Sequence, residues 1–146
     1  MTLRRALPHD VAECVAIRGL TRENAISATR LAELGITAQS WAADVAADRL
    51  PGFVWTHGPQ LAGYCFGDAA SGEVVVLALR PAFEGQGIGK ALLATTMAEL
   101  RERGHPQLTL GCAADPAVRA HGFYRHLGWR PTGERDRYGD EVLTHP

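Results

Sequence analysis

Apolar and polar residues follow two different periods along the chain, and the change between them predicts where strands and helices lie. The strongest strand is predicted over Glu73–Leu79, Glu-Val-Val-Val-Leu-Ala-Leu, which is apolar on both faces as a central strand should be. Arg80-Pro81 ends it, because proline cannot donate a hydrogen bond to a neighbouring strand. The strongest helix is predicted from Gly87 to Arg103, where apolar residues recur at helical spacing, and Gly104 closes its last turn.

The remaining elements follow from shorter patterns and from the cap and turn residues between them. Asp10 suits the N-cap of a first helix, and Thr37 suits that of a second helix, which ends near Asp48. His57-Gly58-Pro59-Gln60 separates two apolar runs and predicts a hairpin. The other predicted strands are 2–7, 53–56, 61–66, 108–112, 129–134 and 141–144, and a last helix is predicted over 116–127. This order predicts an α+β fold, or a three-layer α/β fold, with one mixed sheet and helices on both faces.

Composition narrows the class of protein. The length of 146 residues is typical of one domain, predicted to span residues 1–146, and the 46% hydrophobic and 21% charged content excludes a disordered chain or a coiled coil. The net charge of −1 argues against a nucleic-acid binder. Three cysteines without zinc-ligand spacing predict no metal site and a reduced, cytoplasmic protein. The apolar stretches are too short to predict a membrane span.

One segment carries candidate chemistry: Glu84-Gly85-Gln86-Gly87-Ile88-Gly89-Lys90, between the strongest strand and the strongest helix. Its three glycines allow a sharp turn and the close approach of an anion, and the N-terminus of a helix favours a phosphate or pyrophosphate. The segment is not a Walker A loop, which would need Gly at position 84 and Ser or Thr at position 91. It is not a Rossmann fingerprint either, which would need GxGxxG after an early strand. The alternative is a glycine-rich loop that only turns the chain.

Two motifs together resemble the GNAT family of N-acetyltransferases. Gly87 and Gly89 match the family's pyrophosphate loop, Gln/Arg-x-x-Gly-x-Gly/Ala, and Leu79-Arg80-Pro81 matches the strand end before that loop. Ala120 and Tyr124 match two positions of the family's last-helix pattern, and the Leu-Gly-Trp that follows is similar to its Leu-Gly-Phe ending. The resemblance covers nearly the whole chain and implies a GNAT-like mixed, mostly antiparallel central sheet.

The resemblance implies an acetyl-CoA-dependent N-acetyltransferase that transfers an acetyl group directly to a primary amine of a small molecule in a ternary complex. Acetyl-CoA would lie between the strands 73–79 and 108–112, which should part at their C-terminal ends. Tyr124 would protonate the departing thiolate as general acid, and a core aromatic is the alternative. The residues implied to bind acetyl-CoA are Leu77, Ala78, Leu79, Gly85, Gln86, Gly87, Ile88, Gly89 and Lys90.

The incoming amine is mostly protonated at neutral pH, so a proton acceptor is also expected. Glu73 is the candidate, because a period of two places it on the face of Leu77 and Leu79. A solvent-facing carboxylate at the edge of a turn is the alternative. His121 lies one turn before Tyr124, and a surface histidine is the alternative interpretation there.

Two positions depart from the family pattern. Glu84 stands where Gln or Arg is usual, and Ala117 stands where Asn is often found. A carboxylate at position 84 should weaken pyrophosphate binding unless its side chain turns outward. These departures keep a second function open, a non-catalytic acyl-CoA-binding or regulatory module of the same fold.

The resemblance also indicates where the acceptor amine would bind, over residues 18–40 and 135–141. Arg22, Glu23, Asn24 and Arg30 are candidates to recognise an amine that bears a carboxylate, and a solvated helix face explains them equally well. A small-molecule amine is the expected partner, a homodimer is left open, and no nucleic-acid or membrane partner is expected.

Overall fold

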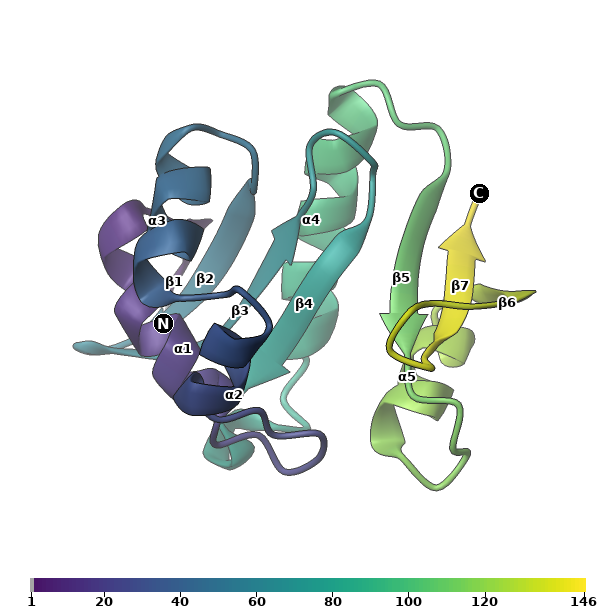
Figure 1. The fold of residues 1–146 in the computed structure, drawn as a ribbon, viewed down its shortest axis with the longest axis horizontal. Coiled ribbons are helices and arrows are strands. Elements are labelled where there is room, and N and C mark those ends of the chain that lie inside the picture. The colour runs from purple at the N-terminus through teal and green to yellow at the C-terminus, as the bar shows by residue number, and fades with distance from the viewer. Residues whose placement is uncertain (1) are drawn as a thin grey trace.

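The computed structural model describes residues 2–146, and every strand predicted from the sequence is present in it (Figure 1). The strands are β1 (Thr2–Arg5), β2 (Gly52–His57), β3 (Gln60–Gly67), β4 (Val74–Leu79), β5 (Leu108–Cys112), β6 (Arg130–Arg135) and β7 (Glu141–His145). The helices are α1 (Val11–Arg18), α2 (Ala28–Glu33), α3 (Ala38–Ala46), α4 (Ile88–Glu102) and α5 (Arg119–His126), with 3-10 turns η1 (Pro8–Asp10) and η2 (Pro81–Phe83).

The strands form two antiparallel sheets that are joined at one point. The first has the order β1-β2-β3-β4 and the second the order β5-β7-β6. A parallel bridge between Glu73 and Thr109 links β4 to β5, and the N–H of Thr109 donates to the carbonyl of Gly72 at 3.3 Å. Beyond this bridge β4 and β5 part towards their C-terminal ends (Figure 1). The predicted mixed, mostly antiparallel fold is confirmed, and so is the parting of its two central strands, but the single sheet expected from the sequence is divided into two because only one bridge joins them.

Two clusters of buried side chains lie on opposite faces of the first sheet. One joins α1 and α3 to the sheet and contains Val11, Ile17 and Trp41. The other packs α4 against strands of both sheets and contains Leu92, Leu110 and further residues as far as β7. Figure 1 shows α1, α2 and α3 in front of the first sheet and α4 behind it. The second cluster therefore holds the two sheets together while β4 and β5 diverge.

Asp10 is the N-cap residue of α1, as the sequence predicts, but its side chain does not cap the helix. Asp10 already has helical backbone angles. Its carboxylate accepts hydrogen bonds from the N–H of Leu7 at 2.8 Å and from the guanidinium of Arg4 at 2.8 and 2.9 Å. Burial opposes ionisation, but these bonds hold the pKa of Asp10 below its ordinary value. The carboxylate therefore ties β1 to the start of α1.

The sequence analysis also missed α2 and began α5 too early. Ser27 caps α2 by accepting from the N–H of Arg30 at 3.1 Å, and Gly35 follows the helix with a φ of 84°. Before α5, the carboxylate of Asp115 accepts from the N–H of Ala117 at 2.9 Å and holds the chain in a turn, so the helix begins at Arg119. Thr37 caps α3 as predicted. Among the helices of residues 2–146, none has the length and apolar character needed to cross a membrane.

Strand β4 contains a β-bulge that changes which side chains share a face. The register with β3 shifts next to Gly67, so that Val75 has no direct partner and is 38% exposed. Because of this extra residue, Val74 packs in the same cluster as Leu77. The prediction that Glu73 shares the face of Leu77 is therefore wrong, since a strict period of two does not continue through a bulge.

Candidate active site

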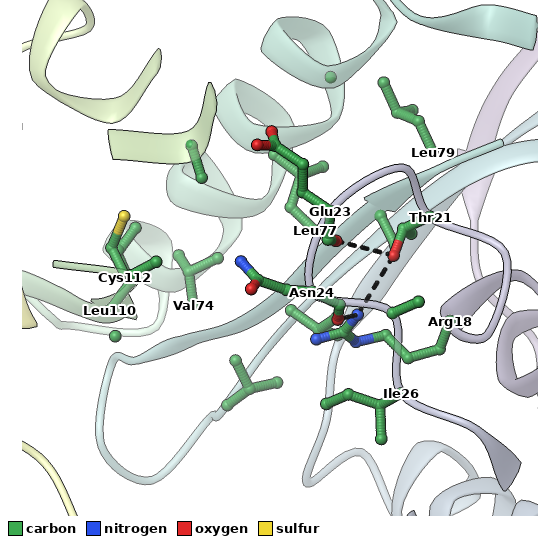
Figure 2. Close-up of a pocket in the computed structure, with 18 of the residues that line it drawn as sticks. Arg18, Thr21, Glu23, Asn24, Ile26, Val74, Leu77, Leu79, Leu110 and Cys112 are labelled. Carbon is green, nitrogen blue, oxygen red and sulfur yellow. Dashed lines mark hydrogen bonds between the residues drawn. The ribbon is translucent and has the colours of Figure 1, made fainter. Parts of the chain in front are cut away.

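A cavity of about 960 Å3 opens where β4 and β5 part (Figure 2). Its walls are the end of α1 and the connection after it, helices α2 and α3, strand β4, the start of α4, the end of β5, the first half of α5 and the turn between β6 and β7. Its volume lies near the upper end of the range typical of small-molecule sites, roughly 300–1,000 Å3. The cavity therefore has the size of a large small-molecule binding site.

The edge of β4 that faces the cavity offers unpaired backbone groups. The N–H of Arg80 donates to the carbonyl of Ala62 on β3 at 2.9 Å. Backbone groups alternate in direction along a strand, so the N–H and C=O groups of Leu77 and Leu79 point away from β3 and towards the cavity. Those of Ala78 point to β3, and Ala78 lines the cavity with its neighbours, so its role as a binding residue stays a prediction that its backbone groups do not favour.

The glycine loop presents the start of α4 to the cavity. Gly85 and Gly87 have φ values of 75° and 81°, which side chains rarely adopt, whereas Gly89 has an ordinary helical conformation. Ala91 is the first residue to donate within the helix, to the carbonyl of Gly87 at 3.1 Å. The N–H groups of residues 88–90 therefore have no acceptor within the helix and are available to an anion.

Four of the six predicted loop residues line the cavity. They are Gly85, Gly87, Gly89 and Lys90. The side chain of Ile88 is buried in the core, so only its backbone could contribute. Gln86 is exposed, and its amide donates to the carbonyl of Ala82 at 3.4 Å, within the loop.

Glu84 is neutralised by two arginines from distant segments. One carboxylate oxygen lies 2.7 Å from Nη1 of Arg119 at the start of α5 and 3.1 Å from Nε of Arg22. Glu23, next to Arg22, accepts a hydrogen bond from the N–H of Arg119 at 2.9 Å. The departure at position 84 therefore does not leave an uncompensated carboxylate beside the glycine loop.

Tyr124 lines the cavity, on α5, and is 9% exposed. Burial raises the pKa of Tyr124 well above its ordinary value, and the nearby thiols of Cys65 and Cys112 act in the same direction. The phenol therefore stays protonated at neutral pH. His121, one turn earlier, is outside the lining, so the structure brings Tyr124 but not His121 to the cavity.

Glu73 lies where β4 and β5 are still joined, before the two strands part. It forms the bridge to Thr109, and the lining of the cavity begins one residue later at Val74. Burial raises the pKa of Glu73, as do the charges of Asp68 and Asp136. Its predicted role as a base stays a prediction, which its position does not favour.

Asp140 is a carboxylate in the cavity that sequence analysis did not single out. It belongs to the β6–β7 turn, where its N–H donates to the carboxylate of Asp136 at 3.0 Å. The turn lies against Gly111 of β5, where an added Cβ would come within 2.6 Å of an Asp136 oxygen. Burial raises the pKa of Asp140, and the charge of Asp136 adds to the effect. The sequence predicted the flanking strands 129–134 and 141–144, but not that the turn between them packs against β5.

The connection after α1 is held in place by its own hydrogen bonds (Figure 2). The guanidinium of Arg18 donates to the carbonyl of Asn24 at 2.6 Å and lies 3.5 Å from the hydroxyl of Thr21. That hydroxyl donates to the carbonyl of Glu23 at 3.0 Å. Asn24 has a φ of 56°. These bonds fix the Arg18 side chain in the cavity wall.

Comparison with known proteins assigns the chain to a family. The sequence model described as the acetyltransferase (GNAT) family matches residues 20–129. The chain belongs to the GNAT acetyltransferase family. The match includes β4, the glycine loop and Tyr124, so the resemblance stated from the sequence is confirmed.

The curated relatives match this chain over only part of its length and part of their own. A mycothiol acetyltransferase of Beutenbergia cavernae is 38% identical over 72 residues, which is 49% of this chain and 24% of the relative. A mycothiol acetyltransferase of Saccharomonospora viridis is 38% identical over 87 residues, or 60% of this chain and 28% of the relative. The chain thus spans about a quarter of the length of these relatives.

Solved structures of GNAT proteins share the fold over almost the whole chain. The PaiA N-acetyltransferase of Thermoplasma acidophilum, in complex with coenzyme A, has a TM-score of 0.71 at 16% identity and covers 99% of this chain and 98% of its own. The ribosomal-protein-S18-alanine N-acetyltransferase of Escherichia coli has a TM-score of 0.70 at 20% identity, with 98% and 90% coverage. At these identities the likeness concerns the fold.

Within residues 2–146, no three His, Cys, Asp or Glu side chains come together in an arrangement that could hold a metal ion.

Proposed function

We propose that the protein is an acetyl-CoA-dependent N-acetyltransferase, which transfers the acetyl group directly to a primary amine of a small molecule. The observation that carries the proposal is one cavity that is lined both by the glycine loop and by Tyr124, whose phenol stays protonated. Membership of the GNAT family supports it, as does the coenzyme A bound to the PaiA structure of the same fold.

Residues of the cavity fit the two chemical parts of acetyl-CoA, which supplies an activated thioester. The N–H groups of residues 88–90 and the ammonium of Lys90 would hold its phosphates. The outward backbone groups of Leu77 and Leu79 would bind its amide-bearing arm as a neighbouring strand would. The N–H of Leu79 would also donate to the thioester carbonyl oxygen as charge develops there.

Tyr124 is the proposed general acid. Its raised pKa keeps the proton on the phenol, so the hydroxyl is available to a thiolate at any physiological pH. For the proton that the amine must lose, Asp140 in the cavity is better placed than Glu73 outside its lining.

Direct transfer is supported by the state of the cysteines. Cys112 lines the cavity, whereas Cys14 and Cys65 are buried in the two cores. Burial raises the pKa of the Cys112 thiol to about 11. A thiol with this pKa is almost wholly protonated at neutral pH and is a poor nucleophile. The amine, and not a cysteine, is therefore expected to take the acetyl group.

The test measures thiol release from acetyl-CoA over a panel of small amines, with wild type and Tyr124→Phe. Loss of the hydroxyl should lower turnover by about 10²–10⁴-fold with CoA affinity little changed. Tyr64→Phe is the matched control, because the Tyr64 hydroxyl is also buried but has no partner within residues 2–146 and lies outside the cavity lining. Binding of CoA without thiol release for any amine would instead support a non-catalytic module. Wild-type turnover in Tyr124→Phe would reject the acid.

A further inference from the structure

Most charged side chains that line the cavity already have a partner. The partners are Arg22 and Arg119 for Glu84, the backbone of Arg119 for Glu23, Glu33 for Arg30, and Arg49 for Asp44. Side chains that are paired at hydrogen-bond distance are satisfied within the protein and have little reason to bind a ligand. This pairing removes Arg22 from the candidates for recognising an acceptor, whereas Arg30 lies 3.9 Å from Glu33 in an exposed and weak ion pair and is tested below.

Three charged residues of the lining make no ion pair within residues 2–146: Arg18, Lys90 and Asp140. Lys90 lies beside the N–H groups at the start of α4, where it can serve a phosphate. Arg18 and Asp140 come from the first helix and from the β6–β7 turn, away from the glycine loop. They are therefore available to the second ligand of the cavity.

Arg18 is held at one side of its guanidinium only. Both bonds to the neighbouring connection, to Asn24 and Thr21, come from Nη1 and reach a carbonyl and a hydroxyl, not a carboxylate (Figure 2). Nη2 and Nε have no acceptor within residues 2–146. A half-buried guanidinium with free donors is stabilised by a carboxylate, whose two oxygens match the spacing of those donors.

Arg18 lines the same cavity as Tyr124 and Asp140. Burial raises the pKa of Tyr124 and of Asp140, and the positive charge of Arg18 opposes the rise in each case. A small molecule that carries both an amine and an anion therefore has a partner for each, Asp140 and Arg18, within one cavity.

We propose that the acceptor is a small amine that also bears a carboxylate, as an amino acid does, and that Arg18 binds this carboxylate while Asp140 faces the amine. The inference rests on the proposed acetyl transfer and adds the substrate class. Arg18 is a specificity-determining residue in this scheme.

The experiment compares matched acceptors that differ in one group: glycine with glycinamide, L-alanine with L-alaninamide, and β-alanine with its amide. The ratio of kcat/KM within each pair is measured for wild type and Arg18→Gln. Arg18→Gln should lower kcat/KM for the carboxylate by about 10–100-fold, as expected for one charged hydrogen-bonded pair, and that for the amide by less than about 3-fold. Comparing ratios cancels the different reactivity of the two amines. A purely structural role for Arg18 predicts equal losses for both members of a pair.

Two further variants sharpen the result. Arg30→Gln removes another arginine of the lining, and Arg130→Gln removes one exposed on β6. Both should leave the ratio unchanged. A ratio that changes in Arg30→Gln and not in Arg18→Gln would overturn the assignment of Arg18.

A binding measurement separates failure of this inference from failure of the proposed reaction. N-acetylglycine and N-acetylglycinamide are titrated by calorimetry into the wild-type protein saturated with CoA. The carboxylate should bind about 10-fold or more tightly, and Arg18→Gln should abolish the difference. Equal affinities in wild type would overturn the inference whether or not acetyl transfer occurs. Absence of thiol release with every acceptor would count against the proposed function alone.

Discussion

The backbone of Gly87 offers a quantitative test of the phosphate site. Its φ of 81° lies in the left-handed region, and a Cβ added there would meet no atom within 4 Å. Gly87→Ala therefore introduces backbone strain without a steric clash. That strain is about 1–2 kcal/mol for an L-residue.

The strain can appear in either of two measurements. If the loop relaxes in the free protein, CoA must restore the left-handed turn, and its Kd should rise by about 5–30-fold, since about 1.4 kcal/mol corresponds to a factor of ten. If the loop cannot relax, the same free energy is lost from folding stability. The losses of binding and of stability together should come to about 1–2 kcal/mol.

Gly104→Ala is the matched control for this prediction. Gly104 lies just beyond the other end of α4, with a φ of 101° and again no atom within 4 Å of an added Cβ. Its strain should appear only as lost stability. Calorimetric titration with CoA and urea unfolding measure both quantities on each variant. A Gly87→Ala protein with wild-type stability and wild-type CoA affinity would refute the account of the loop.

Three other perturbations test separate parts of the structure. Glu84→Gln should tighten CoA binding by about 2–5-fold at low salt, as expected for one exposed ion pair, and the gain should shrink as salt is added; weaker binding in a titration would show that the carboxylate itself serves the ligand. Asp10→Asn should cost about 1–3 kcal/mol at pH 7. The lowered pKa of Asp10 means that its contribution is fully present above the unfolded value of about 3.9 and is lost progressively as pH falls through the lower folded-state pKa, so the gap in urea unfolding should narrow steadily as pH is lowered below about 3.9; a gap that does not narrow would contradict this. Thr37→Ala removes the cap of α3 and should lower stability by about 0.5–2 kcal/mol, visible in the thermal midpoint, whereas an unchanged midpoint would mean that packing alone fixes the helix.

The parts of the fold that sequence analysis predicted are those with a strong local signal. Strand β4 and helix α4 have long periodic patterns, and Thr37 has the geometry that its residue type favours. Asp10 is the predicted N-cap residue of α1, but its carboxylate bonds to Arg4 and to the N–H of Leu7 and not to the helix, and partners outside the helix are invisible to a cap rule. Helix α2 was missed because it is short, although Ser27 before it and Gly35 after it were usable signals.

In the candidate site, too, the residues with a local sequence signal were predicted and the others were not. The glycine loop and Tyr124 could be found because their motifs are contiguous in the sequence. Glu73 was misjudged on β4, because the bulge at Val75 depends on the pairing with β3 and not on the strand's own residues. Arg18 and Asp140 had no motif at all, since their relation arises only when α1 and the β6–β7 turn reach the same cavity. The features that the sequence did not predict are therefore those that depend on contacts between residues far apart in the chain.

The charged and neutral groups that line the cavity affect how easily a bound amine loses its proton. Lys90 and the free N–H groups make the start of α4 positive, and Arg18 and Asp140 bring both signs to the lining of the same cavity. Tyr124 and Cys112, which would lie near the thioester in the proposed complex, are neutral at pH 7 because burial raises the pKa of both. An ammonium that moves from solvent into such a neutral region has its own pKa lowered by desolvation. The same burial that keeps Tyr124 protonated thus favours the free amine, and Asp140 needs only to take the proton at the edge of the neutral region. A strong base beside the thioester is therefore not required, which agrees with the position of Glu73 outside the lining.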